Sequence, residues 1–215
     1  MIDWLLRLLF PPKCVLCQKL LERGQDDLCP VCRQNTREFS YAKKNISFIA
    51  GWTALWYYEG NVRDSLMRFK FSGRRSYAAS YGKLLAMRLL KDEMADFDIL
   101  TWVPISAKRL QKRGYDQVQL LADAVGQELG TAPVATLSKV RHNAPQSSLS
   151  NADARRANVL GAYRVNDPAL IQGKRILLLD DIVTTGATVS ECTRTLMTAG
   201  AKEVFVAAVA ATDHK

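Results

Sequence analysis

Two adjacent carboxylates follow an apolar run near the C-terminal end of the chain. Residues 176–179 read Ile-Leu-Leu-Leu, which is typical of a strand buried on both faces, and Asp180 and Asp181 come directly after them. Neighbouring carboxylates repel one another and contribute nothing to an apolar core. This pair therefore indicates a ligand site at the end of a strand.

A short loop of threonine and glycine follows the carboxylates and leads into a predicted helix over 188–200. Backbone amides of residues 184–188 and the start of that helix favour an anion, and the hydroxyls supply further donors. Two carboxylates suit the vicinal hydroxyls of a ribose, so the pattern predicts a ribose 5-phosphate site. Its loop residues are Thr184, Thr185, Gly186, Ala187 and Thr188.

Four cysteines near the N-terminus form two Cys-x-x-Cys pairs, Cys14 with Cys17 and Cys29 with Cys32. This spacing brings two thiolates together from one tight turn, and two such turns complete a tetrahedral S₄ shell for structural zinc. Two disulfides or redox-active pairs are the alternatives, and the absence of a recognisable export signal disfavours disulfides. Cys192 is in step with apolar neighbours of the 188–200 helix and is interpreted as an inert core residue.

Strands alternate with helices along the rest of the chain, which predicts a parallel sheet with helices on both faces. In such sheets ligands bind beyond the carboxyl ends of the strands, where the carboxylate pair falls. The expected strands are 48–60, 98–104, 134–140, 159–165, 174–181 and 203–212; the expected helices are two within 61–97, joined at Ser72-Gly73, then 115–129 and 188–200.

The net charge of +9 makes a polyanionic ligand plausible, although no run of like charges forms a basic tail. The first fourteen residues combine early charges with a short apolar stretch that ends at two prolines, unlike a signal peptide or a membrane span. We expect a packed amphipathic helix there, with transient membrane contact as the alternative, no stable membrane insertion and a cytoplasmic protein.

Cations and aromatic residues alternate over 68–77, between the two helices of the 61–97 region. A solvated helix end with buried aromatic residues is one interpretation. The other is a patch that stacks bases and binds the phosphates of single-stranded DNA. The residues concerned are Arg68, Phe69, Lys70, Phe71, Arg74, Arg75 and Tyr77.

Residues 176–188, which hold the carboxylate pair and the loop after it, resemble the phosphoribosyl pyrophosphate (PRPP) motif of type I phosphoribosyltransferases at every position. Together with the cysteine cluster, two further segments resemble the ComF/GntX family, which includes competence and DNA-utilisation proteins. They are VPISAKRLQKRGYDQVQLLA at 103–122 and RHNAPQSSLSNADARRANVLGAY at 141–163. The resemblance implies a type I phosphoribosyltransferase-like domain over 46–215, after an N-terminal helix and zinc module over 1–45.

The resemblance also implies roles for residues outside the PRPP-like motif at 176–188. The pyrophosphate-binding loop would follow the strand that ends at Pro104, where Lys108, Arg109 and Arg113 would neutralise a diphosphate together with Mg²⁺. Residues 141–158 would form a flap over the ligand, with His142 interpreted as solvated rather than catalytic. The flap residues of the family pattern are Gln146, Arg155 and Asn158.

By this resemblance the chain binds PRPP and acts in the uptake or use of external, single-stranded DNA, with the DNA-uptake machinery as a partner. One alternative is an active phosphoribosyltransferase that releases pyrophosphate to an unidentified acceptor, with Asp180, Asp181 and Arg113 as the catalytic candidates. The other alternative is an interaction module, which docks a partner through its zinc unit and whose ligand site is idle.

Overall fold

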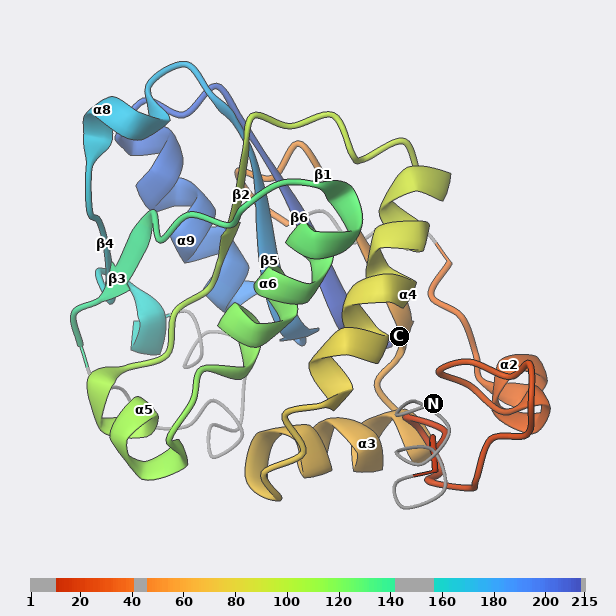
Figure 1. Cartoon of the computed structure of the whole chain (residues 1–215). Coiled ribbons are helices and arrows are strands. Elements are labelled where there is room, and N and C mark those ends of the chain that lie inside the picture. The colour runs from red at the N-terminus through yellow and green to blue at the C-terminus, as the bar shows by residue number, and fades with distance from the viewer. Residues whose placement is uncertain (1–10, 41–45, 142–156, 214–215) are drawn as a thin grey trace.

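A computed structural model describes residues 11–40, 46–141 and 157–213, and a four-stranded parallel sheet lies at its centre (Figure 1). The strand order is β1-β6-β5-β2. The strands are β1 (Gly51–Tyr57), β2 (Ile99–Trp102), β5 (Arg175–Val183) and β6 (Glu203–Ala211). The predicted parallel sheet is thus confirmed, and its carboxyl ends lie together at one edge.

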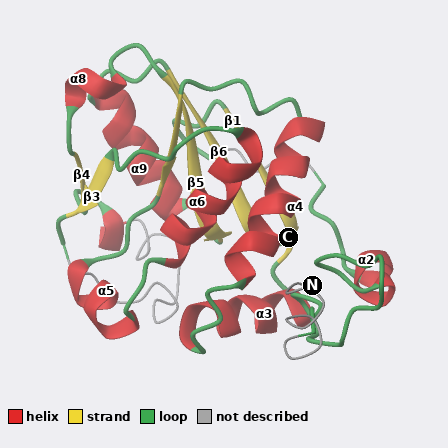
Figure 2. Cartoon of the chain, viewed as in Figure 1, coloured by secondary structure: helices red, strands yellow, loops and turns green. Residues whose placement is uncertain are grey.

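Both faces of β5 are buried, because its side chains alternate between two apolar cores. Leu177 and Leu179 pack in one core with α4 (Tyr77–Lys91) and α6 (Gln117–Leu129). Ile176 and Leu178 pack in the other core with α9 (Ala187–Thr198). Figure 2 shows α4 and α6 side by side across the sheet from α9. This explains the continuous apolar run, since a strand covered on both faces needs no polar alternation.

The predicted strands at 134–140 and 159–165 do not join this sheet. They are shorter than expected, β3 (Leu137–Lys139) and β4 (Tyr163–Val165), and pair antiparallel in a separate two-stranded sheet. Only Leu137 is buried in β3, whereas the residues of β5 are almost all buried. A half-covered hairpin suits antiparallel pairing, which tolerates solvent on one face.

The predicted helices are confirmed with small shifts at their ends. The 61–97 region forms α3 (Gly60–Phe71) and α4, which the turn at Ser72-Gly73 separates. Asp116 caps α6, because its carboxylate accepts hydrogen bonds from the amides of Val118 and Gln119. Within the described ranges, the short helices α2 (Pro30–Asn35), α5 (Ala107–Arg113) and α8 (Pro168–Ile171) were not predicted.

The cysteine module packs against α3 and shares its core (Figure 1). Ser65 of α3 donates a hydrogen bond to the carbonyl of Val15, and Arg68 donates to the carbonyl of Leu16. Two side chains of α3 therefore satisfy backbone carbonyls of the module. The predicted N-terminal helix lies outside the described residues, and among those described no helix is long and apolar enough to cross a membrane.

Candidate ligand-binding cavity and metal centre

A cavity of about 1190 Å³ lies where the parallel strands end. Its walls include residues that follow each strand: Tyr58 after β1, Val103 and Pro104 after β2, and Thr212 after β6. Residues of the helices α3 and α5 also line the cavity. The cavity occupies the position at which open α/β sheets bind ligands.

Asp181 lies in this cavity, on the face of β5 that α6 covers. One of its carboxylate oxygens is 2.9 Å from Nζ of Lys70 in α3, and the other accepts a 2.7 Å hydrogen bond from Gln117 of α6. Gln117 in turn accepts a hydrogen bond from Arg113 of α5. Residues from three helices therefore hold this carboxylate in place.

Asp180 points to the opposite face of β5, because the strand continues through both carboxylates to Val183. The strand thus runs two residues past the expected 174–181, and because both carboxylates lie within it the two side chains diverge. Asp180 also lines the cavity, and its carboxylate accepts a 2.8 Å hydrogen bond from the amide of Asp181. Burial, and then the charge of Asp181, raise the pKa of Asp180 to about 8, against the opposing effect of Lys70.

The loop after β5 forms a turn at the start of α9. Gly186 caps this helix with a φ of +81°, in the left-handed region that glycine favours. Thr184, Gly186, Ala187 and Thr188 line the cavity, so four of the five predicted loop residues are placed there. The fifth, Thr185, accepts a 3.4 Å hydrogen bond from the amide of Ala187 and so shapes the turn.

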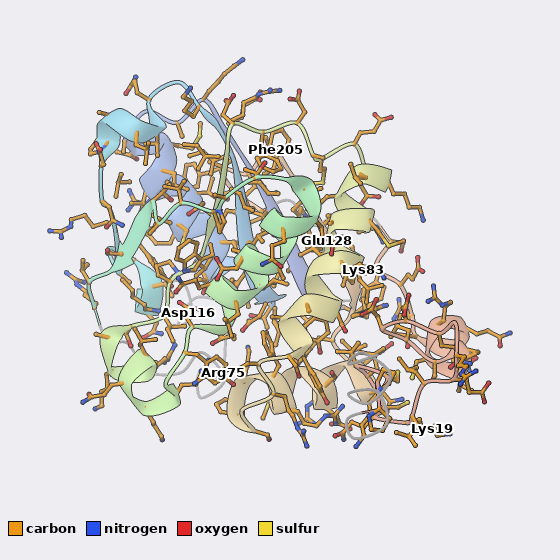
Figure 3. The ribbon with its side chains drawn as sticks, in the orientation of Figure 1. Lys19, Arg75, Lys83, Asp116, Glu128 and Phe205 are labelled. Atoms are coloured by element: carbon orange, nitrogen blue, oxygen red, sulfur yellow. The ribbon has the colours of Figure 1, made fainter. Side chains whose placement is uncertain are left out.

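The predicted pyrophosphate-binding cations lie on a helix rather than in a loop. Lys108, Arg109 and Arg113 belong to α5 and line the cavity. Asp116 fixes the position of α5, because its carboxylate accepts a hydrogen bond from the amide of Ile105 at 3.1 Å as well as capping α6. Figure 3 labels Asp116 beside this junction. Among the described residues, two carboxylates and seven cations line the cavity: Arg63, Lys70, Lys108, Arg109, Lys112, Arg113 and Lys139.

Lys139 was missed at the sequence level, because its place depends on the β3–β4 hairpin. Its ammonium donates a 3.0 Å hydrogen bond to the hydroxyl of Tyr163 in β4, and both side chains line the cavity. Burial lowers the pKa of Lys139 and raises that of Tyr163. Lys139 thereby adds a cation on the side of the cavity toward which Asp180 points.

The predicted flap lies mostly outside the described residues, with His142, Gln146 and Arg155 among those left undescribed. Asn158, at its C-terminal end, lines the cavity. The chain just beyond is anchored to α9, because the amide of Gly161 donates a 2.7 Å hydrogen bond to the carboxylate of Glu191.

The aromatic and basic stretch at 68–77 divides into two environments. Phe69 is fully buried and Arg68 reaches the zinc module, so neither forms a surface patch. Phe71 is 65% exposed. Arg75 lies over the ring of Tyr115 and donates to the carbonyl of Gly114 (Figure 3 labels Arg75). The interpretation with buried aromatic residues thus holds for Phe69, while cations remain exposed at the start of α4.

The four predicted cysteines come together in a single cluster, with all four sulfur atoms within 4.8 Å of one another. The Sγ atoms of Cys17 and Cys29 are 3.6 Å apart, near the spacing of about 3.8 Å that a tetrahedral zinc–thiolate shell sets. Cys29 also caps α2 by accepting from the amide of Cys32 at 3.5 Å, and this hydrogen bond lowers its pKa to about 7. The geometry and donor set fit structural zinc, and Cys192 is buried in α9 away from the cluster.

The fold and this site define a phosphoribosyltransferase-type domain joined to a zinc ribbon. The phosphoribosyl transferase domain family matches residues 111–215, and the double zinc ribbon domain family matches residues 5–43. Among solved structures, the glutamine PRPP amidotransferase from B. subtilis complexed with ADP and GMP is 20% identical. The match covers 66% of this chain and 30% of that longer one, with a TM-score of 0.45.

Curated relatives match nearly the whole chain. The DNA utilization protein YhgH of Salmonella typhi is 30% identical over 219 residues, covering 91% of this chain and 95% of its own length. The competence protein ComFC of Streptococcus pneumoniae is 27% identical, covering 89% of this chain and 84% of its own. The chain belongs to this ComF/GntX family of competence and DNA-utilisation proteins.

Proposed function

We propose that this chain binds PRPP with Mg²⁺ in the cytoplasm and acts there in the use of external DNA. The observation that carries the proposal is the convergence of three groups in one cavity. They are the carboxylates of Asp180 and Asp181, the turn at 184–188 and the cations of α5. A ribose that carries a 5-phosphate and a 1-diphosphate presents the hydroxyls and anions that these groups would bind.

In the proposed complex, the 5-phosphate binds at the turn before α9. Amides at the start of this twelve-residue helix and the positive end of its dipole favour a phosphate. Gly186 supplies the left-handed turn that begins this helix, and the hydroxyls of Thr184 and Thr188 add donors.

The diphosphate would lie toward α5, with Lys108, Arg109 and Arg113 around it. Mg²⁺ binds oxygen ligands and commonly reaches a protein through substrate phosphates, so it would enter with the diphosphate. The ribose hydroxyls would donate to the ionised carboxylates of Asp180 and Asp181. Lys70 already occupies one oxygen of Asp181, so the ribose must share this carboxylate with it or displace it.

Calorimetry with PRPP and Mg²⁺ tests this proposal. We expect saturable binding by the unaltered chain and a large loss in the Asp180→Asn, Asp181→Asn double variant. Ribose 5-phosphate without the diphosphate should bind more weakly, because it leaves the α5 cations unused. Equal heats from the chain and the double variant would contradict the proposal.

The second candidate function is catalytic transfer of the phosphoribosyl group to an acceptor, and the size of the cavity favours it. The cavity extends past the carboxylates to α3, which leaves room for an acceptor beside the sugar. An acceptor there would attack the anomeric carbon as the diphosphate leaves. Pyrophosphate release, measured with PRPP, Mg²⁺ and a panel of amines and bases, tests this function.

Two further assignments belong to the same proposal. The zinc module would extend over residues 1–45 and the phosphoribosyltransferase-like domain over 46–215. Single-stranded DNA and the DNA-uptake machinery would be partners, as the names of the curated relatives suggest. For a strand, Arg74 and Arg75 offer exposed cations at the start of α4.

A further inference from the structure

Helix α3 presents two different faces. Val62, Ser65, Leu66 and Phe69 are buried in the core. A second face lines the cavity, with residues at intervals of four, seven and eight positions that place them on one side of a helix. These residues are Arg63, Met67, Lys70 and Phe71.

Apolar surface on this face is left uncovered inside the cavity. Met67 is 41% exposed and Phe71 is 65% exposed. The guanidinium of Arg113 lies over the Phe71 ring, 5.1 Å from its centroid. An exposed thioether and an exposed ring within a ligand cavity favour a flat apolar group.

Arg63 carries a positive charge at the other end of this face. Its guanidinium makes no hydrogen bond or ion pair with any described residue, whereas Lys70 is engaged with Asp181. Tyr58, at the end of β1, also lines the cavity. We call Tyr58, Arg63, Met67 and Phe71 the α3 wall. None of them belongs to the groups that we assign to PRPP.

We propose that the α3 wall binds a free nucleotide, with the base against Met67 and Phe71 and the phosphate on Arg63. Complementarity of charge and shape carries this inference, since a nucleotide joins a flat apolar group to an anion. From Arg63 to Phe71 the helix rises about 12 Å, which fits one base with its phosphate rather than a strand of several nucleotides. The inference goes beyond the proposed function, because the wall binds its ligand without PRPP.

Titration of the full zinc-loaded chain with deoxyadenosine monophosphate tests the proposal, in the absence of PRPP. We expect Arg63→Ala to weaken binding about tenfold or more, because a charge-assisted phosphate contact is lost. Met67→Ala should weaken it about fivefold, through lost apolar contact with the base. Both residues are exposed on a helix surface, so the variants should fold.

Matched variants outside the cavity serve as controls. Arg164→Ala, on β4, makes the same charge change as Arg63→Ala at an exposed site that does not line the cavity. Met87→Ala, on α4, makes the same change as Met67→Ala where the methionine is 57% exposed. Both controls should bind the nucleotide as the unaltered chain does.

Two further ligands show whether the base contributes to binding and whether the site distinguishes a single nucleotide from a strand. Deoxyribose 5-phosphate, which lacks a base, should bind about tenfold more weakly and should be insensitive to Met67→Ala. A ten-residue oligodeoxynucleotide should gain nothing from the α3 wall, so Arg63→Ala should leave its affinity unchanged.

The outcome for this inference is distinguishable from that for PRPP. Saturable PRPP binding without nucleotide binding would overturn the α3 wall and leave the proposed function standing. If the chain fails to bind PRPP but binds the nucleotide, and Arg63→Ala and Met67→Ala weaken that binding, the α3 wall is supported and the proposed function is contradicted. Binding of the oligonucleotide alone, with sensitivity to Arg63→Ala, would also overturn the assignment to a free nucleotide.

Discussion

Lys70 and Asp181 form an ion pair in the wall of the cavity, with 2.9 Å between Nζ and Oδ1. The side chains are only 18% and 7% exposed, so the pair is largely withdrawn from water. It joins α3 to β5 across a large sequence separation. Through Lys70, the helix that contacts the zinc module also contacts the proposed ribose site.

We predict that Lys70→Met lowers the free energy of unfolding by about 3 kcal/mol, because it leaves a buried carboxylate without its cation. Adding Asp181→Asn should restore most of the loss, since the amide carries no charge. Urea unfolding of both single variants and the double variant measures the coupling. As a control, Lys83→Met removes a lysine that is 42% exposed and should cost about 1 kcal/mol or less. Additive losses in the double variant would contradict a direct coupling.

The pKa of Asp180 predicts a pH dependence of stability in the free protein. Its folded-state pKa of about 8 lies above the ordinary value of 3.8, so the folded chain holds a proton that the unfolded chain releases. This contribution to stability is fully present below the ordinary pKa and is lost as the pH rises through 8. Asp180→Asn should remove it, so the difference in unfolding free energy between variant and parent should change across pH 4–8 and level off above. A pH-independent difference would show that Asp180 is ionised throughout.

The same pKa predicts how PRPP affinity responds to pH. Ribose hydroxyls need an ionised acceptor, so the affinity should rise with pH up to about 8, by at most about tenfold per unit. Asp180→Asn should flatten this rise, and Asp180→Asn with Asp181→Asn should cost about 1.5–3 kcal/mol for each charge-assisted bond. Calorimetry at several pH values measures both effects. Asp123→Asn, at an exposed position of α6 outside the cavity, is the matched control.

Local spacing made some of the site predictable. The two Cys-x-x-Cys pairs depend on turns of four residues, and the PRPP-like motif depends on one strand, one loop and one helix start. The partners of Asp181 could not be found this way. Gln117 lies 64 residues away, and Lys70 is farther still in sequence. Which carboxylate meets them depends on the face of β5 at which each points, and the strand proved to extend past both.

The β3–β4 hairpin illustrates a second limit. Its residues include strand formers, but whether short strands join the main sheet depends on which of their faces other elements cover. Lys139 therefore enters the cavity through an antiparallel pairing that the alternating pattern of strands and helices did not predict.

For the cysteine cluster, we predict about one zinc per chain. Cys29→Ser should lower the zinc content and destabilise the module, because Cys29 both reaches the cluster and caps α2. Metal analysis of carefully reduced protein, with thermal unfolding before and after chelation, measures both effects. Cys192→Ser should leave the zinc content unchanged, since this thiol lies in α9. Metal-free protein that unfolds identically with and without chelator would contradict a structural zinc.

The last prediction concerns single-stranded DNA at the start of α4. If Arg74 and Arg75 neutralise phosphates, oligonucleotide affinity should fall with salt, with a log–log slope of roughly −0.7 per phosphate. Replacing both arginines with alanine should flatten that slope by about one to one and a half units, whatever the base sequence. PRPP binding should persist, because neither arginine lines the cavity. Arg75 also donates to the carbonyl of Gly114, next to α5, so equal loss of both ligands would instead show that the arginines support the diphosphate site.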